Sequence, residues 1–387
     1  MRGGLRRFSA LAAVATTSSV LALSTNAAPG KRFVSSTSVA AALACAKRGP
    51  AWQALQRALD PPPPAEDWAY HGEALTEAIT GRAAPADAVD APTAARVYQL
   101  CLPIYFFCRE LVSAHQASGG SGALAIGLSA PQGCGKTTLV DALVARFAAD
   151  SLSCAVVSFD DFYHTGSAQD AVAAASPDNP MLQVRGNAGT HDLALGTATL
   201  RALKDGASGS DGGGARDDTP LLIPRYDKAA RGGRGDRAPA ESWPEVADPP
   251  DVVLLEGWMA GFAPLPPDAP VLSRHPGLHE VNELLNRYEE WHAQMDAWVV
   301  LAVEDPECVY TWRLQAEQAM AAAGRPGMSD EQVADFVSRY MPSYRAFLPE
   351  LYSAACADGV DGKPTLLVQV DETRSPVARR APAPGAD

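Results

Sequence analysis

The segment that most restricts the fold is the glycine-rich stretch 127–138, which reads Gly-Leu-Ser-Ala-Pro-Gln-Gly-Cys-Gly-Lys-Thr-Thr. It follows an apolar run and precedes a helical pattern that begins near Lys136. The stretch fits the pattern GxxxxGK[ST], except that Ala130 stands where the pattern has its first glycine. In such a loop, successive backbone N–H groups and the amino terminus of the helix surround phosphate oxygens. The sequence therefore predicts a phosphate-binding loop between a buried strand and a helix.

The loop residues are predicted to bind the phosphates of ATP together with Mg²⁺. Lys136 can reach the β- and γ-phosphates, and the Thr137 hydroxyl can bind the metal ion. The residues predicted to contact the nucleotide are Gly133, Cys134, Gly135, Lys136, Thr137 and Thr138.

Five short apolar runs alternate with helical stretches in the remainder of the chain. They cover 123–129, 154–159, 252–255, 298–303 and 365–370. Because these runs lack polar alternation, we expect parallel strands that are covered on both faces. The prediction is an α/β fold of the P-loop NTPase type, with a five-stranded, mainly parallel sheet, helices on both faces and an N-terminal helical extension. Ligands of such sheets bind at the carboxyl ends of the strands.

Carboxylates follow two of these predicted strands. Asp160 is predicted to be the general base that accepts the proton of a substrate hydroxyl, and Asp161 to orient the metal or its waters. Glu256, after the third run, is predicted to hold Mg²⁺ through water. The alternative for Asp160 and Asp161 is a helix N-cap together with a solvated aspartate, and the alternative for Glu256 is an acidic N-cap.

Basic residues gather in two glycine-rich segments, 185–192 and 224–237, although the chain is acidic overall. Arg185, Lys228 and Arg234 are predicted to hold an acidic substrate, the two arginines because a planar guanidinium binds a carboxylate through two hydrogen bonds. For His191 we expect a structural or substrate-binding role. The alternative is that these charges are simply solvated.

Arg313 is predicted to lie on a helix and to stabilise negative charge on the transferred phosphoryl group. A salt bridge to Glu317, four residues further along the same helix, is the competing interpretation.

Composition limits the function classes. A formal net charge of −13 over 387 residues argues against nucleic-acid binding, which requires a basic face. Beyond the N-terminus, no run of about 18 apolar residues predicts a membrane span. The seven cysteines are odd in number and lack CxxC spacing, so neither a disulfide framework nor a zinc site is expected.

The chain is predicted to divide into four parts. The first 59 residues contain eight Lys or Arg and no Asp or Glu, which is typical of an organelle transit peptide. Composition alone does not separate plastid from mitochondrion. The predicted parts are a transit peptide at 1–38, a helical extension at 39–118, a kinase domain at 119–374 with a flexible insertion at 205–219, and a disordered tail at 375–387.

Taken together, these motifs resemble the plant-type D-glycerate 3-kinases over roughly 120–373. The segments that carry the resemblance are 129–138, 160–163, 185–192, 224–228, 256–259, 312–317, 327–330 and 336–340. The resemblance implies transfer of a phosphoryl group from ATP to the 3-hydroxyl of D-glycerate, as the closing step of photorespiration in the chloroplast. Ala130 conforms to this family's pattern. In the wider relatives, uridine kinase, pantothenate kinase and phosphoribulokinase, the residue that matches Asp160 acts as the base.

Two alternatives remain open. The chain could phosphorylate another small metabolite, a nucleoside or pantothenate, or it could be a non-catalytic nucleotide switch. The second is less favoured, because the guanine-reading segment Asn-Lys-x-Asp is absent from the sequence. No protein partner is predicted.

Overall fold

A six-stranded sheet forms the centre of the molecule in the computed structural model, which describes residues 34–59, 61–205, 221–324 and 327–378. The strand order is β10-β9-β8-β1-β7-β2. The first five strands in chain order are parallel to their neighbours, and β10 pairs with β9 in antiparallel fashion. The strands are β1 (Leu124–Ser129), β2 (Cys154–Ser158), β7 (Val252–Gly257), β8 (Ala297–Val303), β9 (Thr365–Val370) and β10 (Pro376–Val377).

The five predicted strands are all present, and the predicted count of five is corrected to six by β10. This strand has only two residues, and one is a proline, which cannot donate to a ladder and is tolerated at a sheet edge. A strand of this length is too short to produce a hydrophobic pattern that would predict it. Its residues lie within the range predicted as a disordered tail, most of which is outside the described residues.

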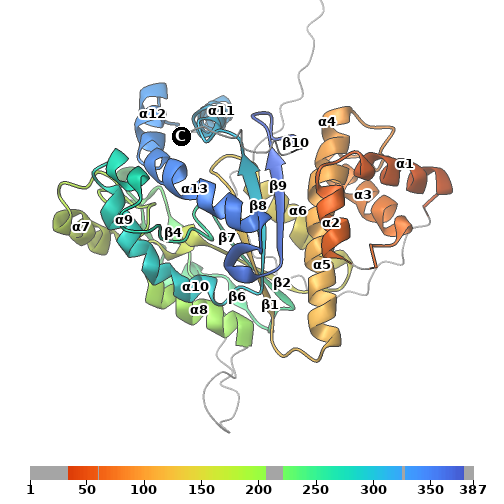
Figure 1. The fold of residues 1–387 in the computed structure, drawn as a ribbon, viewed down its shortest axis with the longest axis horizontal. Helices are drawn as coiled ribbons and strands as arrows, with labels where there is room; N and C mark the ends of the chain where they lie inside the picture. Colours follow the sequence, from red (N-terminus) through yellow and green to blue (C-terminus); the bar gives the residue numbers. More distant parts are fainter. Residues whose placement is uncertain (1–33, 60, 206–220, 325–326, 379–387) are drawn as a thin grey trace, which may run out of the picture.

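Helices cover both faces of the sheet (Figure 1). Helix α13 packs against β8 and β9 on one face, while α5 packs against β1 and α6 against β2 on the other. The helices after β1 are α6 (Lys136–Ala149), α7 (Gly166–Ala175), α8 (Leu193–Asp205), α9 (Leu278–Leu285), α10 (Glu289–His292), α11 (Cys308–Ala322), α12 (Asp330–Ser338) and α13 (Met341–Cys356). Short 3₁₀ turns are η2 (Phe159–Phe162), η3 (Ala230–Gly233), η4 (Ala240–Ser242), η5 (Pro270–Arg274), η6 (Asn286–Tyr288) and η7 (Val360–Gly362).

The segment between α8 and β7 contains two small antiparallel pairs outside the main sheet. Strand β3 (Leu221–Leu222) pairs with β6 (Glu245–Val246), and β4 (Tyr226–Asp227) pairs with β5 (Asp236–Arg237). The second pair carries the basic residues of the segment 224–237 towards η2, because β4 packs against that turn. Most of the predicted insertion at 205–219 lies outside the described residues.

The N-terminal extension is helical and gathers at one side of the molecule (Figure 1). It comprises α1 (Ser36–Lys47), α2 (Ala51–Ala58), α3 (Ala65–Thr80), α4 (Ala91–Ala94), the π-helical segment η1 (Ala95–Cys101) and α5 (Leu102–Ala117). Helix α1 therefore begins inside the range predicted as a transit peptide, of which residues 1–33 lie outside the described part. No helix of the described ranges combines the length and the apolar composition that crossing a membrane requires.

A partly buried polar cluster connects this extension to α6. Arg109 of α5 donates to Asp67 of α3 at 2.8 Å and lies 3.5 Å from Asp150, the residue that ends α6. The hydroxyl of Tyr105 donates to the same Asp150 carboxylate at 2.5 Å. Helix α6 directly follows the phosphate-binding loop. These contacts therefore attach the N-terminal extension to the same helix that positions the loop.

Candidate functional site

The loop between β1 and α6 has the backbone conformation that a phosphate site needs. Gly133 and Gly135 have φ of 83° and 95°, a left-handed region that glycine adopts without strain. A Cβ on Gly133 would also lie 2.6 Å from the Cβ of Trp312. Helix α6 begins at Lys136, and no side chain caps it. Its first N–H groups are therefore available to an anion.

Lys136 and Glu256 meet beside this loop. Strand β7 lies next to β1, so Glu256 at its carboxyl end reaches the Lys136 ammonium and forms an ion pair, with side chains 14% and 19% exposed respectively. Burial lowers the pKa of Lys136, but the nearby carboxylates of Glu256 and Asp160 outweigh it and the pKa is raised. Lys136 is therefore a cation at neutral pH.

The remaining loop residues differ in exposure. Thr137 and Thr138 are exposed on the first turn of α6, where a ligand can reach them. Cys134 is buried, and burial raises the pKa of its thiol to about 11. Its side chain is thus neutral, and only its backbone N–H can serve a phosphate.

The turn η2 after β2 separates the two neighbouring acids. The Ser158 hydroxyl accepts a hydrogen bond from the Asp160 amide at 3.2 Å, and Asp161 Oδ2 accepts one from the Ser158 amide at 3.0 Å. Asp161 Oδ2 also accepts from Arg225 at 3.0 Å. This carboxylate therefore forms a helix cap and an ion pair, and the predicted metal contact would compete with both.

Asp160 has a different environment. Its Oδ1 accepts from the Tyr163 hydroxyl at 2.7 Å, and its Oδ2 pairs with the Lys228 ammonium. Burial alone would raise the pKa of Asp160, but Lys228 and Lys136 hold it far below its usual range. Burial dominates at Asp161 and raises its pKa to about 6 despite Arg225.

Of the predicted substrate-binding cations, Arg185 and Lys228 lie on the Asp160 side of the site. Burial and the Asp160 charge raise the pKa of Tyr163, which the Arg185 charge opposes. The Arg185 guanidinium donates to the carbonyl oxygens of Gly233, at 3.0 Å, and Arg234, and it forms no ion pair with a described residue. Arg234 is instead held by Asp170 of α7 at 2.6 Å.

His191 lies in the interior. Its ring packs against Tyr163 with centroids 4.7 Å apart, and its Nδ1 lies 2.6 Å from the Tyr288 hydroxyl. Burial lowers its pKa to about 3, so the ring is neutral at physiological pH. Its contacts are those of a residue that supports Tyr163 from behind, and fit the structural half of the prediction.

Arg313 lies on α11, as predicted, and forms the ion pair with Glu317 that was the competing interpretation. Its guanidinium also lies 5.2 Å from the ring centroid of Phe336 on α12. Glu317 is buried and accepts from the Met328 amide at 2.9 Å. Arg313 and Glu317 thus connect α11 with α12 and with the residue Met328 that precedes it.

Three further residues of the site were not singled out from the sequence. Tyr163 and Arg225 stand inside the motifs 160–163 and 224–228, so their proximity to the acids could have been suspected. Arg374 follows β9, and its Nε donates to the Gly133 carbonyl oxygen at 2.7 Å. No local pattern marks Arg374, because the sheet alone brings it to the loop.

Two cavities open on opposite edges of the sheet. The first, of about 360 Å³, lies at the carboxyl ends of β8 and β9, the edge that carries the phosphate-binding loop. It is lined by Val303, Glu304, Asp305, Glu307, Cys308, Thr311, Gln369, Val370, Asp371, Glu372 and Val377.

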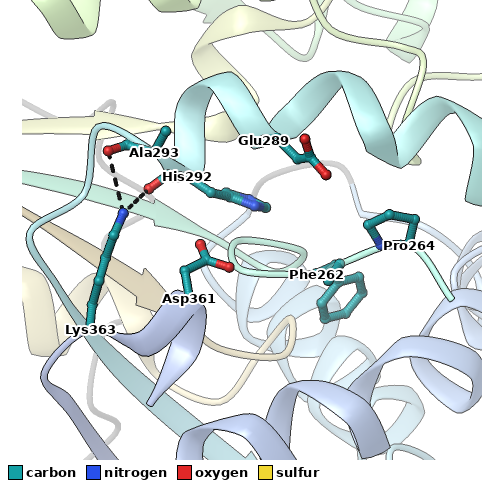
Figure 2. Close-up of a pocket in the computed structure, with 8 residues that line it drawn as sticks. Phe262, Pro264, Glu289, His292, Ala293, Asp361 and Lys363 are labelled. Carbon is teal, nitrogen blue, oxygen red and sulfur yellow. Dashed lines mark hydrogen bonds between the residues drawn. The ribbon is translucent and has the colours of Figure 1, made fainter. Parts of the chain in front are cut away.

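The second cavity, of about 410 Å³, is bordered by residues 262–264, which follow β7, and by segments that precede β8 and β9, and no residue of the phosphate-binding loop lines it (Figure 2). Lys363 extends along its wall and donates to the carbonyl oxygen of His292 at 2.7 Å. Nε2 of His292 in turn accepts from the Gly261 amide at 3.1 Å. These contacts hold neighbouring segments together. Across the described ranges, His, Cys, Asp and Glu side chains nowhere gather in a group of three or more that could hold a metal ion.

Comparison with known proteins shows which family the chain belongs to. It matches no family model. It is 45% identical to the chloroplastic D-glycerate 3-kinase of Arabidopsis thaliana over 291 residues, 74% of this chain but only 62% of that protein. It is 37% identical to the uncharacterized kinase mug58 of Schizosaccharomyces pombe, covering 65% of this chain and 89% of that one. The solved D-glycerate 3-kinase of Cryptococcus neoformans var. grubii is 33% identical, with a TM-score of 0.60, over 72% of this chain and 97% of that structure.

The chain belongs to the D-glycerate 3-kinase family. Membership confirms the predicted resemblance and the P-loop kinase fold. The family fold brings the phosphate-binding loop, Glu256 and Asp160 to one edge of the sheet, as the strand order requires.

Proposed function

We propose that the chain transfers the γ-phosphoryl group of Mg-ATP to the 3-hydroxyl of D-glycerate, giving 3-phosphoglycerate and ADP. The observation that carries the proposal is one site in which the Lys136–Glu256 pair adjoins the phosphate-binding loop and the Asp160 carboxylate, while Lys228 and Arg185 lie on the other side of Asp160. The activity named for the plant and fungal relatives agrees with it.

The donor half of the site suits Mg²⁺. This ion prefers hard oxygen ligands, and proteins hold it through one or two side chains together with water and phosphate oxygens. The exposed Thr137 hydroxyl and the Glu256 carboxylate supply such oxygens. When bound, the metal neutralises charge on the β- and γ-phosphates. Lys136 and the N–H groups of residues 133–138 bind the same phosphates.

In the acceptor half, we assign the base to Asp160. Its carboxylate accepts the proton of the glycerate hydroxyl while the hydroxyl oxygen bonds to the γ-phosphorus and the bond to ADP breaks. Tyr163 orients Asp160 through the 2.7 Å hydrogen bond. Lys228 depresses the pKa of Asp160 in the free protein. If the ammonium moves to the glycerate carboxylate, Asp160 becomes a stronger base when substrate is bound.

The remaining predicted roles are adjusted to the contacts. Arg185 binds the glycerate carboxylate, with Arg234 as a second candidate only if it leaves Asp170. Asp161 positions Arg225 and η2. Arg313 can stabilise the transferred phosphoryl group once α11 and α12 rearrange to release it from Glu317.

A substrate panel tests the reaction. Purified protein with Mg-ATP is offered D-glycerate, L-glycerate, glycerol, uridine and pantothenate, with ADP release as the readout and ³¹P NMR to locate the new phosphate. We expect D-glycerate to be the best acceptor and 3-phosphoglycerate the product. Preference for uridine or pantothenate would establish one of the alternative kinases, and ATP binding without any transfer would favour a nucleotide switch.

Replacing Arg185 with lysine is expected to raise KM for D-glycerate about tenfold or more and to leave KM for ATP nearly unchanged. An ammonium cannot form the two parallel hydrogen bonds of a guanidinium with a carboxylate, and a loss of about 1.4 kcal/mol is a factor of ten. Arg201→Lys is the matched control, because Arg201 is 61% exposed and pairs with Glu290 on the surface. An unaltered KM for glycerate in Arg185→Lys would place carboxylate recognition elsewhere.

We also propose that the protein works in the chloroplast stroma, in photorespiration. The support is the basic, acid-free N-terminus and the chloroplastic location in the plant relative's name. Residues 1–60 fused to a fluorescent protein are expected to direct it to plastids in plant cells. Diffuse cytosolic fluorescence would contradict targeting, and mitochondrial fluorescence would correct the organelle.

A further inference from the structure

Two arginines beside the phosphate-binding loop lack a carboxylate partner among the described residues. Arg374 donates from Nε to the Gly133 carbonyl oxygen and from Nη1 to Gln315 Oε1, at 2.7 and 3.0 Å, and its guanidinium lies 5.0 Å from the ring centroid of Trp312. Arg96 is partly buried and belongs to the N-terminal extension, within η1. Both keep donor groups that no acid satisfies.

The two side chains converge on the last residue of the loop. A Cβ placed on Gly135 would lie 3.9 Å from Nη2 of Arg96 and 3.9 Å from Cδ of Arg374. Gly135 directly precedes α6 and its uncapped N–H groups. Two guanidinium groups and the positive end of a helix therefore surround one short stretch of backbone.

The position of Arg96 is set by tertiary structure. Segment η1 packs against both β10 and α6, so it touches the loop's own helix and the sixth strand. Its π-helical hydrogen bonding places residues five apart on one face, and Arg96 faces Cys101, where its charge opposes the rise in thiol pKa that burial causes. Such π-helical turns recur at functional sites. The cluster of Arg109, Asp67 and Asp150 fixes the extension on which η1 stands.

Electrostatics favours an anion between these groups. Like charges repel at short range, and an anion bound between them offsets this repulsion. Burial and the Arg96 charge both lower the pKa of Arg374, so the pair is unfavourable when no anion is bound. The two lysines of the site, by contrast, each have a carboxylate partner, Lys136 in Glu256 and Lys228 in Asp160. In a chain of net charge −13, two adjacent arginines without an acid mark a binding site for negative charge.

We propose that Arg96, together with Arg374, binds phosphate oxygens of the nucleotide at the Gly135 end of the loop, so that the N-terminal extension supplies part of the ATP site. The inference deepens the proposed function and rests on it for the identity of the nucleotide. Its chemistry is charge-assisted hydrogen bonding from guanidinium to polyphosphate. The N-terminal extension thus contributes a side chain to the nucleotide site, in addition to packing against the sheet.

Replacing Arg96 with alanine tests the proposal. We expect the Kd for ADP, measured by calorimetry, and KM for ATP each to rise about tenfold, because the variant loses a charge-assisted hydrogen bond to a phosphate oxygen. KM for D-glycerate should stay within about twofold. Inhibition by inorganic tripolyphosphate, which has no base or sugar, should weaken by the same factor as ADP binding. Arg96→Lys, which keeps the charge, should recover part of the affinity and also serves if the alanine variant folds poorly.

Arg82→Ala is the matched control, because Arg82 is exposed on the same extension and forms no ion pair with a described residue. It should bind ADP as the native protein does. Unchanged ADP affinity in a folded Arg96→Ala variant would overturn the proposal. Weakened ADP binding with unchanged tripolyphosphate inhibition would also overturn it, by assigning Arg96 to the base or ribose. Because ADP binding needs no acceptor, native protein that binds ADP but does not phosphorylate D-glycerate would refute the proposed acceptor alone.

Discussion

Lys136→Ala is expected to lower kcat by about 100- to 1,000-fold and to weaken ATP binding. The substitution removes the cation that faces the β- and γ-phosphates, where negative charge develops during transfer. It also leaves the Glu256 carboxylate, 14% exposed, without its ion-pair partner. Steady-state kinetics at saturating D-glycerate and calorimetric titration with ADP measure both effects.

A second lysine separates this chemical effect from loss of stability. Lys363 is partly buried at the opposite edge of the sheet, where it donates to the carbonyl oxygens of His292 and Ala293 (Figure 2). Lys363→Ala should lower the melting temperature but leave kcat and KM for ATP near native values. Near-native turnover in a folded Lys136→Ala variant would remove Lys136 from the catalytic site.

The strands could be predicted because each parallel strand is buried on both faces. In β1, β7 and β8, nearly every residue is inaccessible, so the apolar run and the strand coincide. Their carboxyl ends share an edge, which is why Lys136, Asp160 and Glu256 could be expected to meet. Strand β10 could not be predicted, since two residues create no pattern and its place depends on β9.

The ion-pair partners of the charged site residues could not be predicted from the sequence. Lys228 pairs with Asp160 because the β4–β5 pair folds back onto η2, 68 positions away. The adjacent Asp161 forms its ion pair with Arg225 instead, because the hydrogen bond that its carboxylate accepts from the Ser158 amide turns the carboxylate away from Asp160. Neither choice follows from residue type or spacing alone.

For His191 and Arg96, packing and burial determine whether the side chain reaches the site. His191 stands in a polar, glycine-rich segment, yet its ring is enclosed by Tyr163, Tyr288 and other aromatic side chains. Arg96 stands in an ordinary helical pattern, yet η1 delivers it to Gly135. A side chain's access to the site depends on packing between segments far apart in the sequence, and local pattern carries little of that information.

Asp160→Asn is expected to lower kcat by about 100-fold or more, while the Kd for ADP changes by less than about twofold. An amide is isosteric with the carboxylate but accepts no proton from the substrate hydroxyl, and general-base catalysis contributes a factor of this size. Tyr163 can still donate to the amide oxygen, so the local structure should persist. Loss of the Lys228 ion pair should cost little, because the Lys228 side chain is 58% exposed.

Asp161→Asn is the control that distinguishes the two acids, and the pH dependence of kcat/KM provides a second way to tell them apart. Burial raises the Asp161 pKa to about 6, so lowering the pH through this value protonates the carboxylate and deprives Arg225 of its ion pair. Asp160 stays ionised over that range, because its pKa is held far lower. The native profile of kcat/KM should therefore fall below about pH 6, and Asp161→Asn should be flat there with moderate activity at every pH. A crippled Asp161→Asn beside an active Asp160→Asn would reverse the assignment and make Asp161 the base, with a pKa that already suits the task.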